Sequence, residues 1–377
     1  MYWQNEVLRK SAVFTTGGTF RLDLPDNGLL GGISLQISGT PVNDSMIATE
    51  KWRLLDFISA IEVIADGSTV LKSVTGQVAK YLAWLDGGGC IPDQYHNYGT
   101  STKRVRTVVN FGRRFRDPGM GLDLSRYNSV ELQLTNDGSA TYFTGNLAVD
   151  VIGHFLRDAP GGTFPGFMRT EEWRKWTTVA DEKKYLELST RDKLRRIILQ
   201  VIPDVGSSME SETQGYNVAD VIELYLKTGL LKVFDSSLRE LWYDNLWEDG
   251  RDVLQALHSY HTDEYGIHMG LGQTLGIAGA RLMQSHSQST YGTSIWPGED
   301  NATQRRLSNS EADEDAIIAV GLSLENCSFF RFDQSPDPTS WLDTEAMKTV
   351  QLNIHTADSA SAADGTIRVV LDRYAAY

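Results

Sequence analysis

The residues of this chain that are best suited to metal chemistry lie between positions 258 and 268. His258, His261 and His268 stand close to Asp263 and Glu264, and imidazole and carboxylate groups are common zinc ligands. Their spacing contains no His-Glu-x-x-His pair, which would place two histidines on one face of a helix. We therefore interpret these residues as part of a solvated loop and assign no metal ligand.

A glycine-rich segment lacks the context that cofactor chemistry requires. The segment Gly270-Leu-Gly272-Gln-Thr-Leu-Gly276-Ile-Ala-Gly279 is similar to a dinucleotide-binding loop, but its third spacing is wrong and no strand of a β-α-β unit precedes it. The chain has no Gly-x-Ser-x-Gly motif, and no pattern selects one of its 49 Asp and Glu residues as a general acid or base. We assign no catalytic or cofactor-binding residue and interpret the segment as a flexible or tightly packed loop.

A cluster of cations stands out in a chain whose formal net charge is −14. Arginine binds carboxylates and phosphates in bidentate fashion, so such a cluster can contact an acidic neighbouring subunit, a phospholipid or a nucleic acid. The alternative is a solvated strand face with scattered ion pairs. The six cations, all between positions 103 and 116, are Lys103, Arg104, Arg106, Arg113, Arg114 and Arg116.

The overall composition excludes several classes of protein. A net charge of −14 opposes the phosphate neutralisation on which nucleic-acid binding depends and equally opposes adsorption to anionic lipid. Cys90 and Cys327 are the only cysteines, so a disulfide scaffold and a multi-cysteine zinc site are excluded, and we expect both to be small buried residues. No run of 18 apolar residues and no signal-peptide pattern occurs, so we expect synthesis in a cytosol.

The sequence contains an internal repeat. The block from Leu22 to Ile37 returns from Leu186 to Val201 at a constant offset of 164 residues, and Ile61-Glu62-Val63 returns as Ile222-Glu223-Leu224 at an offset of 161. The matches fall on apolar positions that a β-layer buries. One fold is therefore predicted to occur twice in the chain.

A third repeated block shows that the second copy is longer. Positions between Asp117 and Val151 match positions between Asp337 and Leu371 at an offset of 220. The change in offset places an insertion of roughly 59 residues between Leu246 and Asp337. Its polar part, from Ser285 to Asp315, is typical of an exposed loop or projection.

Strand patterns dominate both copies. Alternating apolar and polar residues, as in Val130–Leu134, Leu147–Val151 and Val350–Ile354, predict half-buried antiparallel strands, and the turn-rich connectors favour an all-β sandwich or jelly roll. Each copy also contains one predicted helix. In the first copy it carries Val78, Tyr81 and Leu85 and ends at Gly87; in the second it carries Leu238, Leu241 and Trp242 after a candidate cap at Asp235.

The repeat predicts two domains. We place the first roll with an amino-terminal segment at residues 1–158, a turn-rich linker at 159–169, and the second roll at 170–377. The second roll contains the long insertion at about 247–336.

With the repeat, the strand pattern and the paired helices established, the chain resembles the double-jelly-roll major capsid proteins of tailless icosahedral viruses. This lineage includes membrane-containing phages and adenovirus hexons. The resemblance rests on the three repeated blocks and extends from about Phe14 to Tyr377. Its most characteristic segments are Leu24–Ile33, Leu188–Ile197 and the closing strand Gly365–Tyr374.

The resemblance implies two tandem eight-stranded antiparallel jelly rolls, each with a flanking helix. It implies a viral structural protein, not an enzyme, whose pseudo-hexagonal homotrimers self-assemble into the icosahedral capsid shell of a virion, such as a bacteriophage, in the host cytoplasm. The implied partners are other copies of the chain, neighbouring capsomers, minor capsid or vertex proteins, membrane proteins and an underlying lipid membrane, with no specific nucleic acid and no cofactor. Tyr2 and Trp3 would face lipid or a neighbouring subunit.

Two alternatives from other classes stay open at this point. One is a two-jelly-roll glycan-processing enzyme or duplicated cupin, although cupins need clustered His and Glu on barrel strands and most of the seven His residues lie in predicted loops. The other is a carbohydrate-binding or receptor-binding virion spike. The nine Trp and fifteen Tyr residues could stack on sugars, but Trp84 and Trp242 lie in helical stripes that are typical of a buried core.

Overall fold

The computed structural model describes most of the 377-residue chain. The described residues are 1–40, 54–87, 102–138, 146–160, 163–189, 191–204, 215–227, 229–249, 253–261, 277–285, 313–335, 337–359 and 362–377. For residues 253–261, 277–285 and 313–321 this description covers the backbone.

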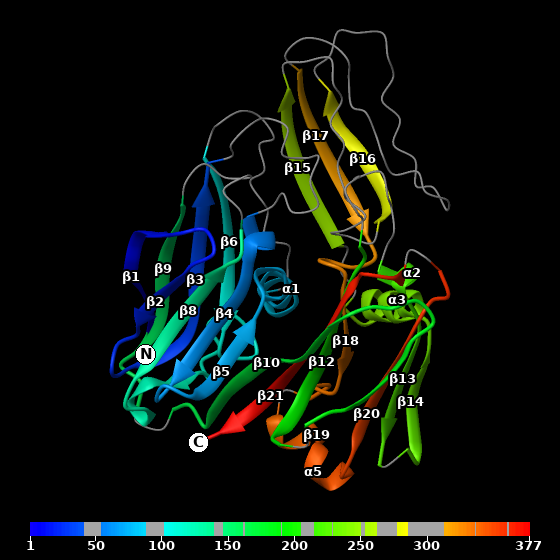
Figure 1. Ribbon diagram of the computed structural model, residues 1–377. Helices are drawn as coiled ribbons and strands as arrows, with labels where there is room; N and C mark the ends of the chain where they lie inside the picture. Colours follow the sequence, from blue (N-terminus) through cyan, green and yellow to red (C-terminus); the bar gives the residue numbers. More distant parts are fainter. Residues whose placement is uncertain are drawn as a thin grey trace.

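The first part of the chain forms two antiparallel sheets that pack face to face (Figure 1). One has the strand order β1-β9-β3-β6 and contains β1 (Tyr2–Phe14), β3 (Leu29–Gly39), β6 (Lys103–Asn110) and β9 (Leu147–Arg157). The other has the order β2-β8-β4-β5 and contains β2 (Thr19–Asp23), β4 (Ile58–Ala65), β5 (Thr69–Val74) and β8 (Val130–Asn136). The short strand β7 (Leu122–Asp123) pairs with β3. Eight strands in two packed antiparallel sheets form a jelly roll.

The second part of the chain forms a second jelly roll with the same strand order. One sheet runs β10-β21-β12-β18, from β10 (Gly166–Thr177), β12 (Lys193–Ile202), β18 (Cys327–Arg331) and β21 (Thr366–Ala376). The other runs β11-β20-β13-β14, from β11 (Lys183–Glu187), β13 (Ala219–Leu226), β14 (Leu231–Ser236) and β20 (Val350–Thr356). The short strand β19 (Leu342–Asp343) pairs with β12, as β7 pairs with β3.

The repeat predicted from sequence is therefore a repeat of structure. Strands β2 and β11 begin 164 residues apart, β4 and β13 begin 161 apart, and β8 and β20 begin 220 apart. The equivalent residues Leu35 and Leu199 are both completely buried. The predicted all-β class and the tandem eight-stranded rolls are confirmed.

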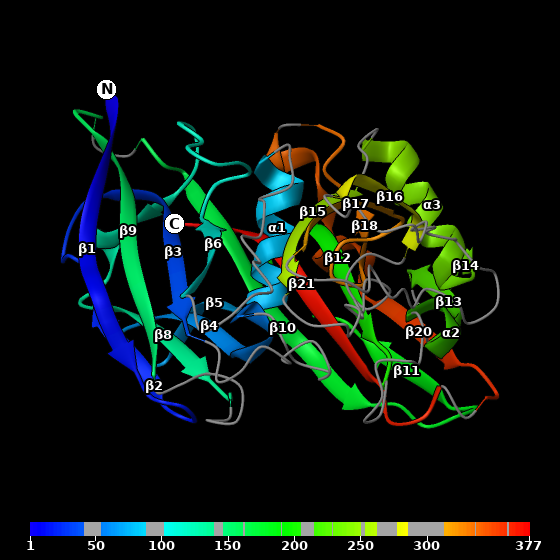
Figure 2. The same ribbon diagram turned by 90° about the horizontal axis from the view of Figure 1, so that it is seen from above.

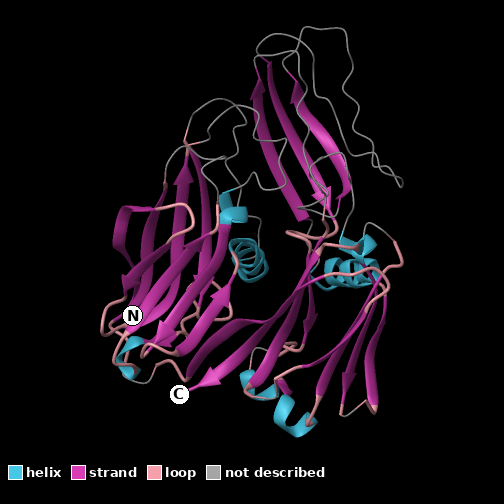
Figure 3. Ribbon diagram, in the orientation of Figure 1, coloured by secondary structure: helices cyan, strands magenta, loops and turns pink. Residues whose placement is uncertain are grey.

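One flanking helix accompanies each roll (Figure 3). Helix α1 (Gly76–Gly87) buries Val78, Tyr81 and Leu85, and helix α3 (Leu238–Asp249) buries Leu238, Leu241 and Trp242. The remaining helical segments are short: α2 (Gly215–Val218), α5 (Thr344–Met347) and the single 3₁₀ turns Leu54–Phe57, Leu124–Arg126 and Pro338–Ser340.

The predicted cap of the second helix is wrong. Asp235 lies in β14, where its backbone pairs with Glu223, so it is too far from the helix. Ser237 takes the cap position instead, because its Oγ accepts a hydrogen bond of 3.2 Å from the backbone N–H of Glu240.

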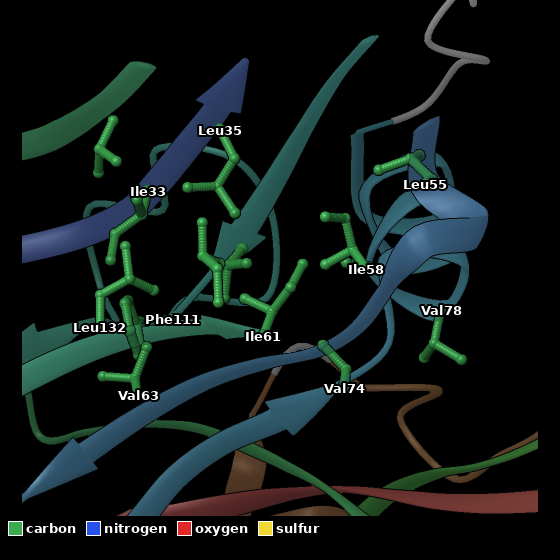
Figure 4. Close-up of a cluster of buried hydrophobic side chains, with 14 of the residues drawn as sticks. Ile33, Leu35, Leu55, Ile58, Ile61, Val63, Val74, Val78, Phe111 and Leu132 are labelled. Atoms are coloured by element: carbon green, nitrogen blue, oxygen red, sulfur yellow. The ribbon is translucent and has the colours of Figure 1, made fainter. Parts of the chain in front are cut away.

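Apolar side chains from both sheets fill each roll. Figure 4 shows part of the first core, where Ile33 and Leu35 of β3 lie near Ile61 and Val63 of β4. The second core is likewise apolar and includes the fully buried Trp242. The first cluster also includes residues of the second roll, namely Phe167, Ile198, Leu324, Cys327, Phe329 and Val370. The rolls therefore share apolar surface.

The two rolls also share one sheet. β5 of the first roll pairs in parallel with β10 of the second, at Lys72 opposite Thr170 and Ser73 opposite Glu171. This pairing joins sheet β2-β8-β4-β5 to sheet β10-β21-β12-β18. β10 begins at Gly166, so the start of this strand overlaps the segment 159–169 that we expected to be a linker.

Part of the expected insertion is a regular sheet. Strands β15 (Val253–His261), β17 (Asp313–Gly321) and β16 (Ile277–Ser285) pair in the order β15-β17-β16 and extend beyond the second roll (Figure 1). β18 lies within the expected span 247–336 but belongs to the roll, because it pairs with β12.

This sheet corrects the interpretation of the histidine-rich segment. His258 and His261 lie on β15, not in a loop, because apolar residues of β17 provide a partner strand that is distant in sequence. His268, Asp263, Glu264 and residues 270–276 lie outside the described residues, as do positions 286–312. The end of the glycine-rich segment, Ile277 to Gly279, lies on β16, and both ends of the predicted exposed loop, Ser285 and Asp313 to Asp315, lie on strands, so these parts are not loops. Among the described helices, none is long and apolar enough to span a membrane.

The assignment of the helix cap can be tested by mutation. Ser237→Ala is expected to destabilise α3 by about 1 kcal/mol, because the N–H of Glu240 loses its acceptor. A loss of this size lowers the thermal midpoint by roughly 2–4 °C in a domain of this size. Ser237→Thr retains the hydroxyl and is the control. Equal midpoints for the alanine and threonine variants would contradict the assignment.

Candidate functional site at the junction of the two rolls

The junction brings one helix of the first roll against one sheet face of the second. Arg196, Ile198 and Gln200 of β12 point to the same side as their partners Asp372, Val370 and Arg368 on β21. Helix α1 covers this face, and Figure 2 shows it between the two rolls. The junction therefore contains both apolar and charged side chains.

A buried carboxylate, Asp372, is the centre of the charged part. Its Oδ1 accepts a hydrogen bond of 2.8 Å from Thr170 Oγ1, which in turn accepts one of 2.6 Å from Lys72 Nζ. Its Oδ2 lies 3.2 Å from Arg196 Nη2 and 3.5 Å from Arg195 Nη1. All of these side chains except that of Lys72, which lies on β5, belong to the second roll.

Arg195 and Arg196 connect this centre to the first roll. Both guanidiniums form ion pairs with Asp86 of α1, at 3.2 Å for Arg195. Arg195 also donates to Asp333 Oδ2 at 2.7 Å and to the backbone carbonyl of Arg113 at 2.9 Å. The two arginines thus contact carboxylates from both rolls.

Two further polar contacts continue along α1. Lys80 Nζ lies 3.2 Å from Glu325 Oε1, and both side chains are 1% exposed. Gln77 Oε1 accepts a hydrogen bond of 2.9 Å from Gln200 Nε2. Because removing one partner leaves a buried charge uncompensated, these contacts favour a single orientation of the rolls.

The pKa values of the cluster reflect burial and mutual attraction. Burial lowers the pKa of Lys72 to about 8, although Asp372 and Asp86 oppose this effect. Burial raises the pKa of Asp372, but Arg196, Arg195 and Lys72 outweigh it, so the pKa is lower than usual. Burial also disfavours charged Arg196, but Asp86, Asp372 and Asp333 raise its pKa above the usual value. Asp372 and Arg196 therefore stay ionised.

A small cavity lies beside the cluster. Lys72, Asp86, Asn110, Thr170 and Asp372 contribute to its lining. Its volume of about 20 Å³ has room for one water molecule. A space of this size is too small for a substrate. We refer to the ion pairs beside it, which join the two rolls, as the structural clamp.

The six cations between positions 103 and 116 do not form one patch. Lys103 is buried, whereas Arg104 and Arg106 are exposed on β6. Arg113 forms an ion pair of 2.7 Å with Asp117, and Arg116 donates a hydrogen bond of 2.7 Å to Asn5 on β1. The stretch follows β6 and then the loop after it.

These arginines flank a buried histidine on the outer face of sheet β1-β9-β3-β6. His154 Nε2 lies 2.7 Å from Ser34 Oγ, and its Nδ1 lies 2.8 Å from Asn5 Oδ1. Burial, Arg116 and Arg106 together lower the pKa of His154 to about 4. The imidazole is therefore neutral near pH 7.

Two other sequence expectations can be placed. Cys327 is buried, as predicted, and burial raises the pKa of its thiol, while Cys90 lies outside the described residues. The Trp3 ring packs over Gly31, where a Cβ atom would lie 2.5 Å from the indole. Tyr2 is 54% exposed.

The sequence analysis did not identify the junction cluster. Its one local signal is the pair Arg195-Arg196, which interrupts the otherwise apolar pattern of β12. Two adjacent cations in a buried strand require buried counter-charges. Their partners Asp86, Asp333 and Asp372 are far away in the sequence and carry no such signal.

The sequence matches no protein-family profile and no curated protein. Its structure, however, is similar to solved viral proteins. The STIV major capsid protein aligns with a TM-score of 0.61 at 12% identity, over 100% of this chain and 97% of that chain. A chain in the atomic structure of Sulfolobus Turreted Icosahedral Virus aligns with a TM-score of 0.62 at 12% identity, over 99% of this chain and 91% of that chain.

A third similar structure is PBCV-1 VP54, fitted into a reconstruction of the virophage Sputnik. It aligns with a TM-score of 0.60 at 9% identity, over 99% of this chain and 94% of that chain. At such identities the similarity defines the fold. The chain has the double-jelly-roll fold of viral major capsid proteins.

The role of the clamp can be tested with two variants. Asp372→Asn is expected to destabilise the protein by about 3–5 kcal/mol, because Arg196 and Arg195 lose a buried counter-charge. Lys72→Met is expected to be neutral or stabilising at pH 7, because burial penalises this cation more than its partners favour it. Chemical unfolding followed by fluorescence measures both. Equal losses in the two variants would contradict the central role of Asp372.

The neutral His154 predicts a pH dependence. Its folded pKa of about 4 lies below the usual 6.5, so its stabilising effect is complete above pH 6.5 and is lost as the pH falls toward 4. His154→Gln is expected to reduce the fall in thermal midpoint over this interval. Identical pH profiles for the variant and the wild type would show that His154 is not responsible.

Proposed function

We propose that this protein is the major capsid protein of an icosahedral virus and that it forms pseudo-hexagonal homotrimers. The observation that carries the proposal is the side-by-side fusion of two equivalent rolls. The alignment with the STIV major capsid protein over 97% of that chain supports it. Two equivalent rolls per chain and three chains per ring would give a block with six similar sides.

The buried ion pairs at the junction are consistent with a role as a capsid subunit. A capsid block transmits the geometry of one contact to the next, so the two rolls of a chain must hold a fixed orientation. The buried pairs of Asp86 with Arg195 and of Lys80 with Glu325 across the junction favour one orientation over others.

The proposed location is the capsid shell of the virion, with assembly in the host cytoplasm. The proposed partners are other copies of the chain, neighbouring capsomers, minor capsid or vertex proteins, membrane proteins and an underlying membrane, without a specific nucleic acid. We also propose that the chain is not an enzyme and that it divides into rolls at 1–158 and 170–377.

Burial removes Trp84 and Trp242 from the sugar-binding alternative, whereas Trp247 of α3 is 85% exposed. Trp84 and Trp242, the two tryptophans in the helical stripes, are at most 4% exposed. Both side chains pack in the cores of their rolls. They are therefore unavailable for stacking on a glycan.

The proposal predicts a trimer in solution. Light scattering of the purified chain at micromolar concentration is expected to give about three times the 42.0 kDa of one chain. Negative-stain images are expected to show hexagonal plates of uniform outline. A monomer at this concentration, with the circular dichroism of a folded β protein, would contradict the proposed function.

A further inference from the structure

Both partners in the junction have counterparts elsewhere in the chain. Within the junction, α1 of the first roll covers the outer face of sheet β10-β21-β12-β18, and β5 pairs with the edge strand β10 of that sheet. By the repeat, α3 and β14 of the second roll correspond to α1 and β5, and sheet β1-β9-β3-β6 corresponds to the covered sheet. These two counterpart surfaces lie at opposite ends of the folded molecule, as the positions of β1 and β14 in Figure 2 show.

The counterpart surfaces are exposed. On β14, Leu231 and Val233 are about half exposed, and Trp247 of α3 is 85% exposed. On the other end, Val7 of β1 is 61% exposed, and Phe115 in the loop after β6 is also exposed. Exposed apolar side chains at both ends are typical of surfaces that bind a partner.

The helix end is acidic. Glu240, Asp244 and Glu248 occur at four-residue spacing and are all exposed, so they form one stripe on α3. Asp244 and Glu248 occupy the helix positions that Leu82 and Asp86 occupy in α1. Leu82 and Asp86 line the junction cavity, so this side of α3 is the one that the repeat directs toward a sheet.

The sheet end is basic. Arg104 and Arg106 of β6 lie opposite Ser38 and Gln36 of β3, on the outer face of the sheet. Arg114 and Arg116 follow in the next loop, and Arg114 is exposed. In the junction, Asp86 of α1 meets the basic pair Arg195-Arg196 of the sheet. The free ends preserve this arrangement of an acidic helix and a basic sheet.

The two sheets differ in polarity in the expected way. Ile198 and Cys327 belong to the covered sheet and lie in the shared apolar cluster. The equivalent positions in the exposed sheet are Ser34 and Arg106, since Cys327 pairs with Gln200 and Arg106 with the equivalent Gln36. A contact that forms after folding needs such polarity, because its surface is first exposed to water.

We propose that α3 of one copy packs on the outer face of sheet β1-β9-β3-β6 of a second copy, with β14 beside the edge strand β1 and with the stripe Glu240, Asp244 and Glu248 against Arg104, Arg106, Arg114 and Arg116. The proposed contact between two chains thus has the same arrangement as the junction within one chain. It is a head-to-tail contact, which produces a closed ring when the rotation between copies closes. The inference rests on the proposed function, because it identifies the surface through which the trimer forms.

A charge exchange tests the contact. Arg104→Glu with Arg106→Glu, and separately Glu240→Lys with Asp244→Lys, place like charges across every contact of the ring. Each double variant is expected to raise the dissociation constant of the trimer at least about tenfold. All four positions are exposed, and circular dichroism verifies folding. The milder pair Arg104→Gln with Arg106→Gln is expected to act in the same direction.

The variant with all four substitutions restores opposite charges and is expected to recover the trimer. Mixed with wild type, it is expected to form separate trimers, because every mixed contact joins like charges. The control is Lys183→Glu with Arg191→Glu, which reverses two exposed charges near β11 and is expected to leave the trimer unchanged.

The possible outcomes distinguish a failure of the proposed contact from a failure of the proposed function. If the wild type is a trimer and both double variants assemble equally well, this contact is wrong while the proposed function stands. Loss of the trimer in the double variants without recovery in the fourfold variant would also overturn the pairing. A monomeric wild type would contradict the proposed function itself.

Discussion

The buried ion cluster around Asp372 is the constraint on which the rest of the molecule depends. Each roll has its own apolar core, so either sheet pair could form by hydrophobic burial alone. Hydrophobic contact is non-directional, however, and does not select one angle between two rolls. Lys72, Thr170, Arg195 and Arg196 around Asp372 supply directional contacts at a buried site, where an unpaired charge is costly. The double roll therefore behaves as one unit.

The same junction explains why the two halves of the repeat have diverged in polarity. Ile198, Val370 and Phe329 cover a surface that is buried as soon as the chain folds. On the matching surface of the first roll, Arg106 is exposed to water in the single chain and donates a hydrogen bond to the buried Ser34. A duplicated fold can thus use one docking geometry twice, once with an apolar surface and once with a charged one.

Low identity to the solved capsid proteins is compatible with a common fold for a physical reason. A jelly-roll strand requires apolar residues at alternate positions and permits many side chains at each of them. Leu35 and Leu199 occupy one such position in the two rolls of this chain. An identity of 12% therefore accompanies a TM-score of 0.61 over the whole chain.

The sequence by itself determined the elements whose signals are local. The alternation in Val130–Leu134 predicted β8, the stripe Val78, Tyr81 and Leu85 predicted α1, and the constant offsets predicted two equivalent rolls. Only the tertiary structure decided the rest, because it depends on partners that are distant in sequence. Ser237 replaced Asp235 as the cap because pairing with β13 extended β14 through Ser236, and β17 paired with a segment that resembles a loop. The buried charges of Arg195 and Arg196 are stable because folding brings Asp86, Asp333 and Asp372 to them from three distant segments.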